Sequence, residues 1–453
     1  MVQAALTMSS SAVGVWNLQI LAHFYEAPNN FWPSIFTIAL LTNYCNCICF
    51  SLRLLIMAKT KAQSQSGKKQ KRPAQKSPEE LYALTIEAIE TADLEIALEH
   101  AQTLLSVVDP DLAGTTSISE ASPKRIALPA LNLLGEISVE LGDVENARRY
   151  FLLAVKADPD GSVSDDAGGG AEKFLWLAQL SDDGGADSVT WFEKGVRTLK
   201  TQIETLENDA KMGAEEKEIL INEKRGKVAT ALCSVVEVYM TDLSWEEDAE
   251  TRCENLMTEA LLFAPESPEV LQTLASVRLS QLKLEDAQSA LTRSIAMWKD
   301  LDEEDDFIPD YPTRVSLARL LMEAEMEEQA MIVLERLALE DDESVEACYL
   351  GGWCLHLLAD KRKNAMANGS LTKDDEDRID TLKASRKWLL NALKLYELQD
   401  YEDDRLRDHA NELVSELKGV LGPVPEDADA EEEFEEWLDE EDSEGEDENM
   451  QGA

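Results

Sequence analysis

The chain has 453 residues, of which 90 are acidic and 42 are basic, giving a formal net charge of −48. Such a charge argues against a binder of nucleic acid or anionic lipid and favours a basic polypeptide as partner. The alternative is that the acidic residues only keep a long protein soluble. Ala, Leu and Glu are frequent and no sustained strand alternation occurs, so we expect an all-α protein.

Residues 1–56 differ from the rest of the chain. They contain one acid, Glu26, and one base, Arg53, and residues 31–56 are largely apolar. This stretch is long enough to cross a bilayer, and bases follow it, so one interpretation is a membrane anchor with the remainder in the cytosol. Polar residues interrupt the stretch, however, and no basic segment of a secretory signal precedes it. We favour residues 1–56 as a spurious or alternative extension, with Met57 as the start.

Residues 57–76 form a basic arm, with seven bases and no acid. Their composition predicts disorder. The cluster KKQKRP at residues 68–73 is of the nuclear-localisation kind. We therefore expect the protein in both cytoplasm and nucleus, with nuclear import factors among its partners. The alternative is a solvated arm that folds back onto the acidic body.

Helical periodicity begins at Ser77, which together with Pro78 and Glu80 forms an N-terminal helix cap. The most regular segment is residues 128–160. Its small and large residues recur as Leu131, Leu134, Gly135, Gly142, Ala147, Phe151, Ala154 and Pro159. This pattern resembles the tetratricopeptide repeat, in which small residues lie where two antiparallel helices touch. A single such pair cannot bury both of its faces, so we expect copies on either side.

The region 77–425 has further segments with this periodicity, and it carries 73 acidic against 34 basic residues. We expect an α-solenoid of about seven irregular helix pairs. These are at about 77–109, 128–160, 174–208, 227–265, 271–291, 314–337 and 349–392, followed by a closing helix at about 403–421. Residues 161–170 are a predicted linker, and residues 361–377 a polar insertion in the seventh pair.

Residues 426–453 form an acidic tail, with 16 acids and no base. We expect this tail to be disordered. Phe434, Trp437 and Leu438 lie within it and suggest a contact site.

Motifs for catalysis are absent from the sequence. We find no Gly-rich phosphate loop, no HExxH, no nucleophile elbow and no Cys/His cluster at zinc spacing, so we expect neither an enzyme nor a cofactor or metal. The seven cysteines form no CxxC pair, which indicates buried thiols in a reducing compartment.

Several strings resemble the family of assembly chaperones dedicated to ribosomal protein four of the large subunit. They are KFLWLAQLS at 173–181, EVYMTDL at 237–243, GGW at 351–353 and EEW at 435–437. The resemblance covers residues 57–448. It implies a chaperone that holds newly made ribosomal protein four, shields its long internal loop and escorts it to nuclear pre-ribosomes.

The charge suggests how such a chaperone would act. An acidic concave solenoid can replace RNA for a basic protein until ribosomal RNA competes for the same bases, and the solenoid itself would bind no nucleic acid. Because the first helix of each pair forms the inner surface, we expect the client contacts there. The candidates are Asn132, Glu136, Glu140, Gln179, Glu237, Asp242, Trp353 and His356, followed by Trp176 and Tyr239, which are also candidates for the core.

Two other functions remain open. A membrane-anchored receptor for basic targeting peptides requires residues 1–56 to be inserted in a membrane. A general interaction scaffold would bind several basic proteins with similar affinity.

Overall fold

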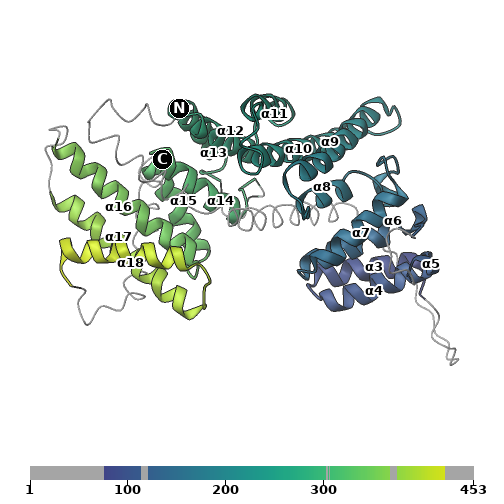
Figure 1. The fold of residues 1–453 in the computed structure, drawn as a ribbon, viewed down its shortest axis with the longest axis horizontal. Helices are drawn as coiled ribbons and strands as arrows, with labels where there is room; N and C mark the ends of the chain where they lie inside the picture. The colour runs from purple at the N-terminus through teal and green to yellow at the C-terminus, as the bar shows by residue number, and fades with distance from the viewer. Residues whose placement is uncertain (1–75, 114–120, 302–304, 306, 368–374, 424–453) are drawn as a thin grey trace, which may run out of the picture. The chain divides into compact units, whose positions relative to one another are not determined.

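The computed structural model describes residues 76–113, 121–301, 305, 307–367 and 375–423. The extension 1–56, all of the basic arm except Lys76, and the tail 426–453 lie outside these residues. Within the described ranges the chain forms helices and no strand (Figure 1). The α-helices are α3 (Pro78–Glu90), α4 (Leu94–Val108), α5 (Pro110–Ala113), α6 (Leu128–Glu140), α7 (Val144–Ala157), α8 (Glu172–Gln179), α9 (Gly185–Asn208), α10 (Ala214–Met240), α11 (Ala249–Phe263), α12 (Pro268–Ser280), α13 (Leu284–Ala296), α14 (Tyr311–Glu323), α15 (Glu327–Glu340), α16 (Val345–Ala367), α17 (Asp375–Leu398) and α18 (Asp404–Leu421).

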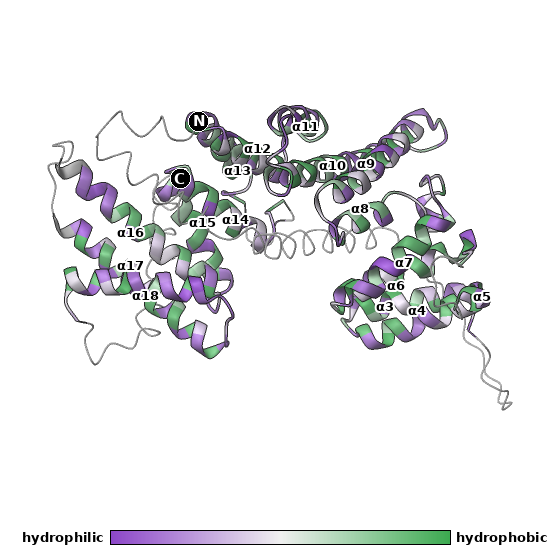
Figure 2. Cartoon of the chain, in the orientation of Figure 1, coloured by the Kyte–Doolittle hydropathy of each residue, from purple (hydrophilic) through white to green (hydrophobic). Residues whose placement is uncertain are grey.

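The helices pack as seven consecutive pairs: α3 with α4, α6 with α7, α8 with α9, and so on to α16 with α17. Each second helix also packs against the first helix of the next pair, and α18 packs against both helices of the last pair. Figure 2 shows that apolar and polar residues occupy different sides of most helices, as stacking of amphipathic pairs requires. This packing confirms the predicted all-α solenoid of tetratricopeptide type with a closing helix.

Close contact between the two helices of a pair depends on glycine. A Cβ on Gly135 in α6 would lie 2.6 Å from the ring of Phe151 in α7. A Cβ on Gly351 in α16 would lie 2.2 Å from the ring of Trp388 in α17. Both rings are fully buried. In these two pairs an aromatic ring therefore occupies the space that any other residue's side chain would need.

Four of the turns between paired helices share one feature. Ala92, Gly142, Leu282 and Glu325 lie at equivalent turn positions and all have a positive φ, between 56° and 71°. In the second pair the N–H of Asp143 donates to the carbonyl of Ser138 at 2.8 Å, which closes the end of α6. Gly142 alone of these residues adopts a positive φ without strain.

Two expected boundaries are wrong. The first helix of the fourth pair begins at Ala214 and not near residue 227, because Ile221 is buried and extends the packing of α10 against α9. Much of the predicted insertion 361–377 is helical, since α16 continues to Ala367 and α17 starts at Asp375. Across these two helices the guanidinium of Arg362 donates to the hydroxyl of Thr381 at 2.5 Å.

The glycine contact can be tested by Gly351→Ala. The added methyl group collides with Trp388, and overpacking of this kind costs about 1–3 kcal/mol. We expect a lower melting temperature in a circular-dichroism thermal scan. The matched control is Gly226→Ala in α10, where a Cβ meets nothing within 4 Å, so the better helix propensity of alanine should leave stability equal or higher by up to about 1 kcal/mol. Equal melting temperatures for the two variants would show that the close contact is unimportant.

Candidate protein-binding site

Acidic side chains lie along successive first helices in two groups. The first group is on α6, α8 and the N-terminal half of α10, and the second is at the end of α10, on α12 and at the start of α14. We call Glu136, Glu172, Glu223, Glu237, Glu269 and Asp310 the acid row. Glu136 in α6 and Glu172 in α8 are close enough for one charge to disfavour the other. Glu237 in α10 and Glu269 in α12 interact in the same way, as do Glu269 and Asp310, the N-cap of α14. These three interactions join acids of neighbouring repeats.

Lys227 in α10 is the base that lies within this row. Its ammonium is 2.8 Å from the carboxylate of Glu172 and 3.1 Å from that of Glu223. These two carboxylates raise the pKa of Lys227, which outweighs the opposing effect of its burial. Lys227 therefore stays charged and joins α8 to α10, while it neutralises only part of the row.

Glu136, Glu237 and Glu269 form no ion pair with a described residue. The carboxyl groups of Glu136 and Glu237 also make no hydrogen bond with a described residue. Burial and the charge of Glu172 raise the pKa of Glu136 to about 8, and burial and the charge of Glu269 raise the pKa of Glu237 to about 7. Glu269 accepts one hydrogen bond, from the hydroxyl of Thr230 at 3.4 Å, and its pKa is also raised by burial and by Asp310. A cationic side chain from a partner would favour the ionised form of these carboxyl groups, so they are suited to bind one with release of their protons.

Amide groups without partners lie on the same helices. Both side-chain polar atoms of Gln179 in α8 are buried and unpaired, and so is Nε2 of Gln272 in α12, a residue that is 6% exposed. Gln272 lies one turn from Glu269. A buried amide usually finds a hydrogen-bond partner, and a peptide backbone offers both donors and acceptors. The first helices thus combine negative charge with groups that can bind a peptide backbone.

Some of the predicted contact residues lie on this surface. Glu136 belongs to the acid row, as does Glu237, and Gln179 accompanies them. Glu140 is exposed at the end of α6. Asn132 lies one turn before Glu136, but its amide donates to the carbonyl of Gly168 at 2.9 Å, so it holds a loop, and its Oδ1 is unpaired.

Other predicted contact residues have structural positions. The carboxylate of Asp242 accepts a hydrogen bond from the N–H of Gly185 at 3.0 Å, so Asp242 supports the start of α9. Trp176 is 2% exposed and stacks on Phe151 with ring centroids 5.9 Å apart. Tyr239 is 5% exposed, and its hydroxyl accepts a hydrogen bond from Arg252 at 2.6 Å. We therefore remove these three residues from the set of contacts.

Trp353 and His356 face the closing helix. The ring of Trp353 meets that of His409 in α18 edge to face, with centroids 5.1 Å apart. Nε2 of His356 is 3.7 Å from the carboxylate of Glu416 in α18. These two residues attach α18 to the last pair, which leaves less of their surface for a partner.

Sequence reasoning missed Glu172, Glu223, Lys227, Glu269 and Asp310. Glu223 was not among the predicted contacts, because the first helix of the fourth pair was expected to begin near residue 227. The spacing of four between residues 223 and 227 is the signal that could have shown an acid–base pair on one helix face.

The predicted linker 161–170 is fixed by buried charge. Lys173 and Asp158 form an ion pair at 2.9 Å in which both side chains are fully buried. Asp158 also accepts a hydrogen bond from the N–H of Ser162 at 3.0 Å, and Lys173 donates to the carbonyl of Gly170 at 2.6 Å. The loop that Asn132 contacts is therefore held at both ends.

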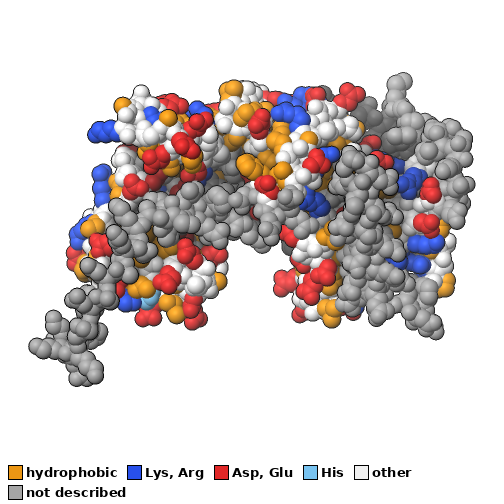
Figure 3. All heavy atoms as spheres, turned by 180° about the vertical axis from the view of Figure 1, so that it is seen from behind, with side chains coloured by type: hydrophobic (Ala, Val, Ile, Leu, Met, Phe, Trp, Pro, Cys, Tyr) orange, Lys and Arg blue, Asp and Glu red, His pale blue; other side chains and the backbone are white. Residues whose placement is uncertain are grey.

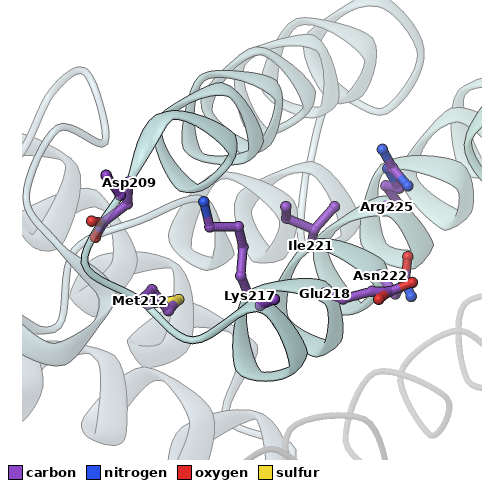
Figure 4. A pocket seen from close by; sticks show the side chains of 9 residues that line it. Asp209, Met212, Lys217, Glu218, Ile221, Asn222 and Arg225 are labelled. Atoms are coloured by element: carbon purple, nitrogen blue, oxygen red, sulfur yellow. The ribbon is translucent and has the colours of Figure 1, made fainter.

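Other candidate sites are weaker. A cavity of about 390 Å³ lies at the turn between α9 and α10, where Lys217 and Arg225 line it (Figure 4). Their charged groups are already engaged: Lys217 donates to the carbonyl of Glu207 at 3.2 Å, and Arg225 pairs with the Glu207 carboxylate at 3.4 Å. Among the described residues no three His, Cys, Asp or Glu side chains gather closely enough to hold a metal ion.

The structure also bears on the thiols and on the membrane interpretation. Cys233, Cys253, Cys348 and Cys354 are free and buried, as predicted. None of the helices in the described ranges is long and apolar enough to span a bilayer. The stretch 31–56, on which the membrane interpretation depends, lies outside those ranges.

Known proteins are similar to this chain over most of its length. A protein of Emericella nidulans called "probable assembly chaperone of rpl4" is 46% identical over 367 residues, which cover 80% of this chain and 87% of the relative. A Schizosaccharomyces pombe protein with the same description is 34% identical over 320 residues, 70% of this chain and 88% of that one. This chain belongs to the family of rpl4 assembly chaperones.

A solved structure of this family also matches. It is described as assembly chaperone of RpL4 (Acl4), residues 1–338, and it is 48% identical with a TM-score of 0.58, over 64% of this chain and 99% of the solved one. No protein-family model matches the chain.

The raised pKa values predict how stability of this family member depends on pH. Above pH 4.5 the unfolded chain releases the protons of Glu136 and Glu237, whereas the folded state holds them up to a pKa of about 8 for Glu136 and about 7 for Glu237. Stability should therefore fall as the pH rises from about 5 to 8. In Glu136→Gln/Glu237→Gln this fall in stability should be smaller. At pH 8 the variant should therefore melt a few degrees higher than the wild type, since about 1 kcal/mol corresponds to roughly 2–4 °C.

Melting temperatures at pH 5, 6, 7 and 8 check this expectation. Glu145→Gln/Glu285→Gln, which changes two exposed acids on second helices, is the control and should keep the wild-type slope. Parallel curves for the acid-row variant and the wild type would contradict the expectation.

The buried ion pair gives a further prediction. Lys173→Met leaves the buried carboxylate of Asp158 without its cation, which costs about 3–5 kcal/mol. We expect Asp158→Asn to restore part of this loss in the double variant. Arg197→Met, at an exposed site in α9, should change the free energy of unfolding by less than about 0.5 kcal/mol. Urea denaturation of the four proteins measures these differences, and a Lys173→Met variant as stable as Arg197→Met rules out a structural role for the pair.

Proposed function

We propose that this chain is a dedicated assembly chaperone that binds newly made rpl4 and delivers it to nuclear pre-ribosomes. The observation that carries the proposal is the acid row, in which Glu136, Glu237 and Glu269, on the first helices of three different pairs, form no ion pair with a described residue. The names of both curated relatives and of the solved structure supply the identity of the client. The chain acts by binding, and its role requires no catalysis.

Charge balance gives the mechanism. Ribosomal proteins carry basic segments that pair with RNA in the ribosome and attract other nucleic acids before assembly. Carboxylates such as Glu136, Glu237 and Glu269 take the place of RNA phosphates around these bases, including those of the client's internal loop. Gln179 and Gln272 bind the backbone between them. Ribosomal RNA has a denser charge and displaces the row, which releases the client at its assembly site.

The surface as a whole favours a basic client. Figure 3 shows acidic side chains spread over the visible face, with basic ones in smaller separate groups. Exposed second-helix acids such as Glu145, Glu285 and Glu328 are solvated and screened by salt, whereas the half-buried acids of the row are screened less. The row should therefore contribute more to affinity than an equal number of exposed acids.

Calorimetric titration with rpl4 tests this function. Glu136→Gln/Glu237→Gln/Glu269→Gln should weaken binding at least about tenfold, because hydrogen bonds to charged groups contribute about 1.5–3 kcal/mol each. The control Glu145→Gln/Glu285→Gln/Glu328→Gln removes three exposed acids from second helices and should weaken binding less than about threefold. An equal effect of both variants would show that only total charge matters.

Selectivity separates a dedicated chaperone from a general scaffold. In the same titration another basic ribosomal protein of similar size and charge should bind at least about tenfold more weakly than rpl4. Comparable affinities would support the scaffold.

We also propose that residues 68–73 direct the protein to the nucleus, so that it occurs in cytoplasm and nucleus and meets import factors. Support comes from the basic composition of this cluster. A fluorescent fusion in which Lys68, Lys69, Lys71 and Arg72 are changed to Gln should lose nuclear accumulation. Unchanged accumulation would refute this role.

A further inference from the structure

The acid row lies beside the point where the basic arm joins the repeats. The described chain starts at Lys76, and Ser77 caps α3 by accepting a hydrogen bond from the N–H of Glu80 at 3.1 Å. Tyr82, in the second turn of α3, lies so close to Glu136 that this carboxylate affects its hydroxyl. α3 and α6 also pack side by side. The first acid of the row is therefore close to the attachment point of the arm.

The length of the arm fits the distance to the row. Six residues of helix, from Lys76 to Tyr82, rise about 9 Å. Residues 68–72 precede Lys76 by four to eight positions, which corresponds to about 13–26 Å of extended chain. Neighbouring helix axes are about 8–10 Å apart. The cluster can therefore reach Glu136 in α6 and Glu172 in α8.

The charges are complementary. Residues 66–76 contain five bases, Lys68, Lys69, Lys71, Arg72 and Lys76, and no acid. At the near end of the row stand Glu136, Glu172 and Glu223, of which Lys227 neutralises part. The tail 426–453 cannot occupy this surface, because it is acidic throughout its length.

An independent observation points to a peptide as ligand. Both amide atoms of Gln179, at the end of α8, are buried and unpaired, and so is Nε2 of the nine-tenths buried Gln272 farther along the row. A free cation would satisfy the carboxylates but not these amides. A basic polypeptide satisfies both.

We propose that residues 66–76 are a tethered competitor for the acid row, which the client must displace. The arm is attached beside the row, so its effective concentration there is in the millimolar range, and even weak contacts keep it bound. A client with more bases and a longer backbone displaces the arm from the acid row, whereas short or weakly basic peptides do not. The arm thus raises the selectivity of the surface. This inference rests on the proposed function only in taking the acid row as the client's surface.

A synthetic fluorescent peptide with the sequence of residues 66–76 tests the competition on the full chain. Binding is followed by fluorescence anisotropy at low salt. The arm variant, with Lys68, Lys69, Lys71 and Arg72 changed to Gln, should bind the peptide about three to ten times more tightly than the wild type, because its own arm no longer competes. Adding Glu136→Gln and Glu172→Gln to the arm variant should abolish this gain.

A control variant removes four bases far from the arm in the sequence: Arg197, Lys211, Lys283 and Lys299, all exposed and all changed to Gln. It changes the net charge equally and should alter peptide affinity less than twofold. The proposal is overturned if the arm variant and the wild type bind the peptide equally, if the control gains as much, or if the Glu136→Gln and Glu172→Gln changes leave the gain intact. It is also overturned if the arm acts between molecules, seen as dimers of the wild type and monomers of the arm variant in sedimentation.

The two proposals can fail separately. If rpl4 does not bind but the arm variant gains peptide affinity, the competitor is real and the proposed client is wrong. If rpl4 binds through the row and neutralising the arm changes neither affinity, the client is right and the competitor is refuted.

Discussion

Contact between the two helices of each pair is the constraint on which the structure depends. At Gly135 and Gly351 this contact leaves no room for a side chain, because the rings of Phe151 and Trp388 fill the space. Pairs closed in this way stack through their second helices onto the next first helix. The stacking brings the first helices of successive pairs together, and the acid row follows from their alignment.

That alignment has an electrostatic cost. Glu136 and Glu172 repel each other, as do Glu237 and Glu269, and burial adds to the penalty. Lys227 pairs with Glu172 and Glu223 and partly offsets the repulsion at Glu136, but it does not affect the acids of the row beyond α10. Pairing these acids with bases, or exposing them to water, would make the folded protein more stable. A basic ligand removes the repulsion and therefore stabilises the protein that binds it.

The repeat architecture could be predicted because periodicity and small residues specify helix pairs locally. Gly135, Phe151 and Trp388 all lie in predicted pairs. The site was predicted only in part. Glu136 and Glu237 were found from their helix face, but Glu172 and Glu269 act through neighbours in other repeats, which a single segment does not reveal. Asp242 and Trp176, both predicted as contacts, lie at the start of α9 and in a buried ring stack, and the sequence of a single segment does not distinguish such positions from contact positions.

The central claim is that the acid row selects one basic client. The most direct measurement is mass spectrometry of the proteins that co-purify with the full chain from its native cell, at increasing salt. The account predicts rpl4 in near-stoichiometric amount, lost as salt rises and absent when Glu136, Glu237 and Glu269 are neutralised. A broad set of basic proteins in comparable amounts, or rpl4 retained by the neutralised chain, would contradict it.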